Sequence, residues 1–217
     1  MTDFRVIYAR YRRNALRLLA LMLFMPLVAC TILPESPVLQ VYLLPAQPVA
    51  GYGSGQSFGQ SLRIVQPTTN QFLNSSRIAV QPQGAEITSF SGSRWSDPAP
   101  LLLRNRLIQE FRADGRFLSV SGDEDNVQAE VELNGELLSF QGVYNGDSGE
   151  VVIRFDARLV RTSDRRVITS RSFEVRQSIS GRSMDKVVQA FGLASDRLAA
   201  QMLSWTHQQS ANFPVRQ

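Results

Sequence analysis

The chain has 217 residues, of which 43% are hydrophobic and 19% charged, which is typical of a folded domain and excludes a disordered or collagen-like protein. Its net charge of +4 arises within residues 1–29, which carry five arginines and one acidic residue. Residues 30–217 carry 18 basic and 18 acidic residues. Binding to a phosphate backbone needs several uncompensated basic side chains, so we expect no nucleic-acid partner.

Residues 1–29 are predicted to be a signal peptide. An arginine-rich segment is followed by eleven uncharged residues, Leu18 to Val28. This length suits the apolar region of a secretory signal, whereas a membrane-spanning helix needs about 20 apolar residues. The alternative is a signal anchor that stays uncleaved, with Cys30 as an inert thiol.

The segment Leu27–Cys30 (LVAC) resembles the lipobox of bacterial lipoproteins, and Cys30 is the single cysteine of the chain. The resemblance implies that diacylglycerol is attached to the sulfur of Cys30, that cleavage occurs before this residue, and that the new amino terminus is acylated, as by palmitate. Several acyl chains would make membrane attachment stable. Thr31 is not aspartate, which in the lipoprotein sorting pattern implies the periplasmic face of the outer membrane.

The rest of the chain is predicted to be one domain. Residues 30–37 contain two prolines and form a lipidated tether, residues 38–207 form the folded domain, and residues 208–217 are a polar tail. A domain of this size buries enough surface to fold without a metal or a disulfide.

The first half of the domain is predicted to contain short strands and one helix. An apolar strand at 38–44 precedes a mobile loop at 45–60, and extended segments follow at 62–65, 77–80 and 86–90. Asp97 is the expected cap of a helix in which Pro98 takes the first position and which runs through Phe111, and Gly115 follows its last turn. Arg104 lies on the apolar face of this helix, where it either keeps its charged end in water or contacts a partner.

The second half alternates with period two, which indicates an antiparallel meander. After the segment 117–120 and a solvated acidic turn at 123–125, apolar residues alternate through residues 127–140, 151–159 and 167–175, with turns at 145–146 and 162–165. Gly135 interrupts the alternation and predicts a bulge there. The charged residues of the alternate positions are expected to form a solvated outer face.

The last predicted element is an amphipathic helix at 184–207, with Ser183 as its cap. The order of elements predicts an α+β fold, with a mostly antiparallel sheet and two helices packed on one face. Its core should include Leu103, Leu107, Phe155, Phe191 and Leu198.

Residues that carry catalytic chemistry are scarce. His207 is the single histidine and lies in a polar segment, Lys186 is the single lysine, and the motif G-x-S-x-G is absent. A zinc site would need several His or Cys ligands. Two carboxylates that meet only in the fold stay an open alternative. We therefore predict no enzyme, no metal site and no cofactor.

The ordered motifs resemble the ABC-type transport auxiliary lipoproteins. These are the lipobox, V-Y-x-L at 41–44, R-I-A-V at 77–80, R-W-S-D-P-A-P at 94–100, L-x-x-x-L-I at 103–108, F-D-A-R-L-V at 155–160 and V-V-Q-A-F at 187–191. The run Ser91-Gly92-Ser93 departs from the aromatic character expected there. The likeness covers nearly all of the mature chain.

The resemblance implies a non-enzymatic accessory of MCE-type transporters, which move phospholipid or other apolar molecules across the bacterial envelope. The implied partners are an MCE-domain protein with its ABC permease and ATPase, and the membrane through the lipid on Cys30. Trp95 either pins the helix to the sheet or contacts a partner. The sequence leaves open whether the chain forms a homo-oligomer.

Two other functions stay open from the sequence. A periplasmic lipid carrier would need an apolar cavity. An assembly factor for outer-membrane barrels or lipopolysaccharide machinery could have the same anchor and a similar α+β domain.

Overall fold

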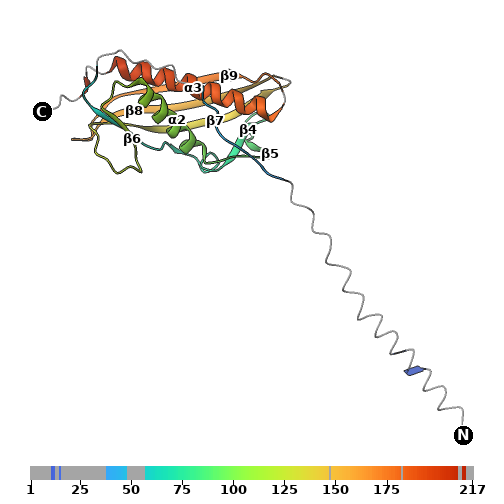
Figure 1. The fold of residues 1–217 in the computed structure, drawn as a ribbon. Helices are drawn as coiled ribbons and strands as arrows, with labels where there is room; N and C mark the ends of the chain where they lie inside the picture. Colours follow the sequence, from blue (N-terminus) through green and yellow to red (C-terminus); the bar gives the residue numbers. More distant parts are fainter. Residues whose placement is uncertain are drawn as a thin grey trace, which may run out of the picture. The chain divides into compact units, whose positions relative to one another are not determined.

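The structure is a computed structural model that describes residues 11, 12, 15, 38–47, 57–146, 148–181, 183–209, 212 and 213. The chain divides into two units, Met1–Val38 and Leu39–Gln217, and the second contains the sheet and both helices discussed below (Figure 1). Cys30 and the rest of the predicted tether at 30–37 lie outside the described residues. No helix within the described residues is long and apolar enough to cross a membrane.

The largest feature of the fold is the predicted meander, which the structure confirms. Strands β7 (Val131–Asn145), β8 (Ser148–Arg161) and β9 (Val167–Ser178) pair in antiparallel order. Their inward side chains are buried, and Gly146 adopts a φ of 63° in the turn between β7 and β8, where glycine is favoured. The alternation in the sequence therefore predicted both the three strands and the face of the sheet that is buried.

The other strands correct the prediction of a mostly antiparallel sheet. β2 and β4 both pair with β7 in parallel, as does the short β3, while β2 also pairs with β6 and β1 with β5 in parallel. Only β4 and β5 form a further antiparallel pair. The nine-stranded sheet is therefore mixed. The bounds of these strands are Gln40–Tyr42 (β1), Ser61–Ile64 (β2), Thr68–Thr69 (β3), Arg77–Gln81 (β4), Thr88–Trp95 (β5) and Ser119–Gly122 (β6).

The expected bulge lies three residues beyond Gly135. The register of β7 with β8 shifts between Leu137 and Ser139, so that Leu138 has no partner in β8. Gly135 is needed for another reason, because a Cβ there would lie 2.1 Å from the carbonyl oxygen of Asp156. The glycine lets the backbones of β7 and β8 approach closely.

The two helices are α2 (Ala99–Asp114) and α3 (Met184–Gln208). The prediction that Asp97 caps α2 is wrong: Pro98 is the N-cap residue, with extended backbone angles and no side-chain cap hydrogen bond, and the helix begins one residue later than expected. Gly115 ends α2 with a φ of 74°. α3 begins after Ser183 as predicted, although the Ser183 side chain forms no cap hydrogen bond.

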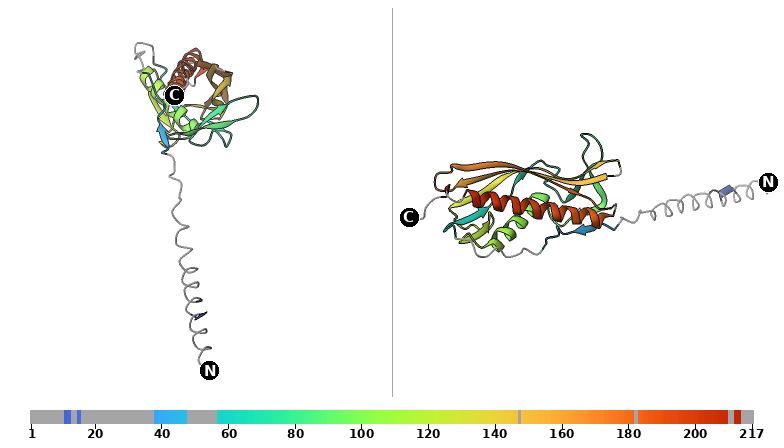
Figure 2. Two further views of the ribbon diagram at one scale, coloured as in Figure 1. Left: turned by 90° about the vertical axis from the view of Figure 1, so that its right-hand side faces the viewer. Right: turned by 90° about the horizontal axis from the view of Figure 1, so that it is seen from above.

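Both helices pack on one face of the sheet and share one core with it. α3 lies along the hairpin of β8 and β9 (Figure 2), while α2 contacts β2, β6 and α3. The five predicted core residues are each at most 1% exposed, which confirms the inner faces of α2, β8 and α3.

The chain that follows β1 lies against α3. A Cβ on Gly192 would be 2.7 Å from the carbonyl oxygen of Pro45, and the backbone N–H of Gln47 donates to Oδ2 of Asp196 at 3.0 Å. Glycine in α3 thus permits a close backbone contact with the segment that enters the domain.

Candidate functional site

Trp95 ends β5 and lies in the core. Its side chain is fully buried, and its ring centroid is 5.2 Å from that of Phe191 and 6.2 Å from that of Phe140, both in edge-to-face arrangement. The indole N–H has no hydrogen-bond partner among the described residues. In this structure Trp95 therefore joins β5, β7 and α3 and presents no exposed surface to a partner.

Arg104 forms ion pairs within the chain. It is 4% exposed, and its Nη1 lies 2.6 Å from Oδ1 of Asp123 and 3.2 Å from Oε1 of Glu124. Burial disfavours the charged guanidinium, but the hydrogen bonds that Arg104 donates to Glu124 and Asp123 outweigh this effect and raise the pKa of Arg104. The acidic turn expected to be merely solvated thus holds Arg104 and links α2 to the loop after β6.

The contacts between α2 and α3 include two more groups of charged residues, one near the middle of both helices and one at their C-terminal ends. Arg106 of α2 contacts Glu110 at 3.0 Å and Asp196 of α3 at 2.6 Å. At the C-terminal ends of α2 and α3, Nε2 of His207 lies 3.2 Å from Oδ2 of Asp114, whose carboxylate also accepts hydrogen bonds from Arg116.

His207 is largely buried, although it lies in a polar segment of the sequence. Its side chain is 19% exposed and its ring lies 5.4 Å from that of Phe58. Burial lowers the pKa of His207, and the hydrogen bond to Asp114 opposes this effect. Within the described residues, no group of three or more His, Cys, Asp or Glu side chains is placed to hold a metal ion.

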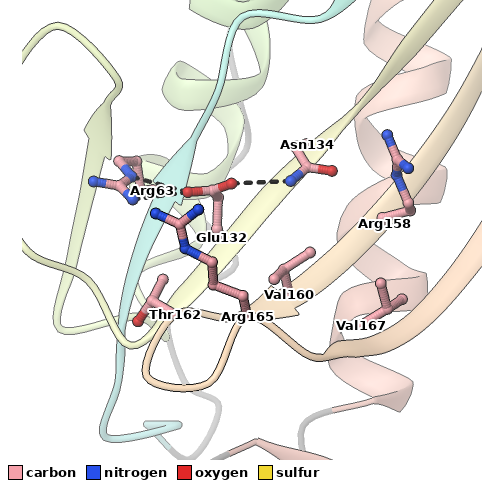
Figure 3. Close-up of a pocket in the computed structure, with 8 residues that line it drawn as sticks. All are labelled: Arg63, Glu132, Asn134, Arg158, Val160, Thr162, Arg165 and Val167. Carbon is pink, nitrogen blue, oxygen red and sulfur yellow. Dashed lines mark hydrogen bonds and ion pairs between the residues drawn. The ribbon is translucent and has the colours of Figure 1, made fainter.

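A hollow of about 460 Å³ opens on the face of the sheet turned away from the helices (Figure 3). Its side chains come from β2, β7, β8, the turn between β8 and β9, and the first residue of β9. Those on β2, β7 and β8 alternate with buried neighbours such as Leu62, Leu133 and Leu159. The lining residues, which we call the arginine hollow, are Arg63, Glu132, Asn134, Arg158, Val160, Thr162, Arg165 and Val167.

One side of the arginine hollow is an ordered ion pair. The parallel register of β2 and β7 places Arg63 beside Glu132, and the Arg63 Nη2 and Nε atoms donate to Oε2 of Glu132 at 2.8 and 3.2 Å. The Asn134 side chain donates to Oε1 of the same carboxylate at 2.9 Å. Both oxygens of Glu132 are therefore engaged, and its charge is balanced by Arg63.

The other two arginines of the hollow have no acidic partner. Arg158 lies opposite Asn134 in the register of β7 and β8, and Arg165 extends from the turn toward Glu132 (Figure 3). No carboxylate among the described residues is within ion-pair distance of either side chain, whereas Asp164 in the same turn pairs with Arg161 and Arg166. The residues that line the hollow thus carry two surplus positive charges.

The sequence did not identify this site. Its alternation placed Glu132 and Arg158 on the outer face, but nothing linked them to Arg63, which is 69 residues before Glu132. The run Arg161 to Arg166, with three arginines and one aspartate, was the available signal.

Apolar side chains are exposed on β1 and its flanks, at the edge of the sheet. Leu39, Val41 and Leu43 are 47%, 51% and 74% exposed. Cys30, the predicted lipid anchor, precedes this strand and lies outside the described residues.

Two solved structures share the fold of this chain. Protein XCC0632 from Xanthomonas campestris has a TM-score of 0.73 at 23% identity, covering 79% of this chain and 97% of that protein. A second solved structure, of an uncharacterized protein, has a TM-score of 0.58 at 17% identity and covers 76% of this chain and 96% of its own. These likenesses show that the α+β fold is shared.

One relative and one protein family match this chain in sequence. The uncharacterized protein bll6063 of Bradyrhizobium diazoefficiens is 27% identical over 153 residues, which are 70% of this chain, and the match spans 41% of that relative's length. Residues 42–203 match the family described as ABC-type transport auxiliary lipoprotein component, from the end of β1 to the last turns of α3. Since the match covers nearly the whole sheet and both helices, the chain belongs to the ABC-type transport auxiliary lipoprotein family.

Proposed function

We propose that this chain is a membrane-anchored accessory lipoprotein that docks an MCE-domain protein of an ABC transport system. The transported molecules are phospholipid or other apolar compounds, and Cys30 holds the protein on the periplasmic face of the outer membrane. The observation that carries the proposal is the family match over residues 42–203, which covers the domain from β1 to α3.

A role without catalysis is supported by how the domain uses its titratable groups. The family is an auxiliary component of transport and not a class of enzyme. His207 contacts the buried carboxylate of Asp114, and the buried Arg106 pairs with Glu110 and Asp196. These contacts tie α2 to α3 and to the loop after α2, which is a structural use of groups that an enzyme would direct into a cleft.

Docking is favoured over carriage of a lipid within the domain. The space between the sheet and α3 is filled by the rings of Trp95, Phe140 and Phe191, whose centroids lie 4.9 to 6.2 Å apart. The arginine hollow is lined mainly by charged and polar side chains. A carrier needs an apolar cavity for acyl chains, and neither region provides one.

Crosslinking in the native envelope tests the docking role. The anchored protein should recover the MCE-domain protein, and a control with the same signal peptide and lipid anchor fused to an unrelated domain should not. Deletion of this chain and deletion of the permease should impair the envelope to the same degree. Failure to recover the MCE protein together with different deletion phenotypes would favour the assembly-factor role, and stoichiometric lipid in the purified protein would favour the carrier.

Fractionation tests the location. The parent protein should sediment with the outer membrane, and Thr31→Asp should shift it to the inner membrane if the sorting pattern applies. Equal distribution of both proteins would contradict the proposed sorting.

A further inference from the structure

We propose that the arginine hollow binds a phosphate ester, with Arg158 and Arg165 as the residues that hold the oxyanion. The ligand class is a phosphate monoester or diester, either as a soluble compound or as the headgroup of a phospholipid. The inference rests on the contacts of the hollow and does not require the docking role proposed above.

The charges of the hollow favour an anion. Glu132 is balanced by Arg63 and uses both of its oxygens, so Arg158 and Arg165 are the two cations of the hollow that have no acidic partner among the described side chains. An unpaired guanidinium offers a planar set of donors that fits phosphate oxygens in pairs.

Other acidic residues lie nearby but outside the hollow. Glu136 and Asp156 face each other in the next cross-strand pair on the same face, and the side chain of Glu130 accepts a hydrogen bond from the backbone N–H of Ser61. Asp164 pairs with the two turn arginines outside the lining. Glu136 and Asp156 oppose an anion on their side of Arg158, so we expect the anion to lie between Asn134 and the turn.

The turn between β8 and β9 fixes the backbone conformation of Arg165. Its φ of 56° is in the left-handed region, which glycine and asparagine adopt far more readily than residues with long side chains. The other described non-glycine residue with positive φ is Asn126, which is a usual choice there. Arg165 is the last residue of the turn that is closed by the hydrogen bond from the Arg161 N–H to the Arg166 carbonyl oxygen, and a left-handed residue is common at this place in a hairpin loop. The turn therefore fixes the backbone from which the Arg165 side chain extends toward the hollow.

The apolar part of the lining favours an ester over a free inorganic ion. Val160 and Val167 lie beside the arginines, and Val167 is 54% exposed. Apolar surface next to an anion site suits the carbon that is linked to the phosphate oxygen. A long polyanion is disfavoured because residues 30–217 carry no net charge.

Calorimetric titration of the full chain in a neutral detergent tests the site. The probes are glycerol 3-phosphate, dihexanoyl phosphatidylglycerol and, as a carboxylate comparison, succinate. We expect saturable binding of one or both phosphate esters with one site per chain. Equal affinity for both esters means that the phosphate group alone is recognised, and at least tenfold tighter binding of the lipid assigns the site to a headgroup. Binding of neither ester, or tighter binding of succinate than of both esters, overturns the proposal.

Single substitutions distinguish binding in the arginine hollow from nonspecific attraction to surface charge. Arg158→Ala and Arg165→Ala should each weaken binding of the esters by at least about tenfold, because each removes a charge-assisted contact. The matched control is Arg154→Ala, on the same strand and face as Arg158 but paired with Glu174 at 3.6 Å, and its affinity should equal that of the parent. Equal losses in all three variants would show nonspecific charge attraction and overturn the site.

Arg165→Gly shows whether a loss of binding is due to the missing side chain or to a loss of folding. Glycine relieves the positive φ, so this variant should have a thermal midpoint at least as high as that of the parent and should still lose binding. A variant that is folded and binds the esters with parental affinity would overturn the role of Arg165.

Discussion

Replacing Phe191 with alanine is the sharpest test of how α3 packs on the sheet. The Phe191 side chain is fully buried, and its ring centroid lies 4.9 Å from that of Phe140 and 5.2 Å from that of Trp95. Truncation of a buried phenylalanine to alanine destabilises a protein by about 3 to 5 kcal/mol. The two ring contacts place this site toward the upper part of that range, and we expect a loss of about 4 kcal/mol.

The loss is measurable as a shift in thermal unfolding. For a domain of this size, each kcal/mol lowers the thermal midpoint by about 2 to 4 °C, so Phe191→Ala should unfold about 8 to 16 °C below the parent. Circular dichroism at the helical band gives the midpoint, and urea titration gives the free energy of unfolding independently. Leu118→Ala is the matched control because Leu118 is 52% exposed, and its midpoint should stay within about 2 °C of the parent.

A shift of less than about 3 °C for Phe191→Ala would refute the reasoning. It would mean that the inner face of α3 does not seat this ring between Trp95 and Phe140. A large shift in the Leu118→Ala control would instead show that truncating an exposed side chain also destabilises the domain. The shift of Phe191→Ala could then not be assigned to lost packing.

Three further changes test other parts of the structure. Gly135→Ala should lower the free energy of unfolding by about 1 to 3 kcal/mol, because the new methyl group meets the Asp156 carbonyl. Gly142→Ala should lower it less, because its Cβ would lie 3.6 Å from the nearest atom. Urea titration compares the two variants, and equal losses would contradict the close approach of β7 and β8 at Gly135. The lowered pKa of His207 means that the unfolded chain binds its proton more readily, so its contribution to stability is complete above about pH 6.5 and declines as the pH falls. The difference in urea midpoint between the parent and His207→Gln should therefore depend on pH between 8 and 5, and a constant difference would contradict burial of the neutral ring. Cys30→Ser should move the protein from the membrane to the soluble fraction, and mass spectrometry should find the parent amino terminus at a lipidated Cys30; an unmodified cysteine would contradict the anchor.

Local patterns predicted the elements that depend on neighbouring residues. The period of two in residues 127–175 and the amphipathic period in 184–207 both depend on which face of an element is buried, and the structure confirms them as β7 to β9 and α3. The direction of the remaining strands does not depend on local pattern. β2 pairs with β6, although three strands and α2 separate them in the chain. The four residues of β2 contain no turn signal that sets a parallel or antiparallel neighbour.

The candidate site was less predictable for the same reason. Arg63, Arg158 and Arg165 meet only because β2 and β8 flank the first residues of β7, a register that no short motif encodes. Arg104 was recognised as unusual from its place on an apolar helix face. Its partner Asp123, however, is 19 residues away in a loop whose path the sequence did not indicate.

The contact between Gly192 and Pro45 has a mechanical consequence. In the anchored protein that we propose, any pull between the membrane and the docked partner enters the domain through β1, an edge strand of three residues that pairs only with β5 among the strands the structure describes. Such a short strand would peel away under little force by itself. The backbone contact of Pro45 with Gly192, together with the hydrogen bond from Gln47 to Asp196, passes that load into the 25 residues of α3 and from there to β8 and β9, on which α3 packs.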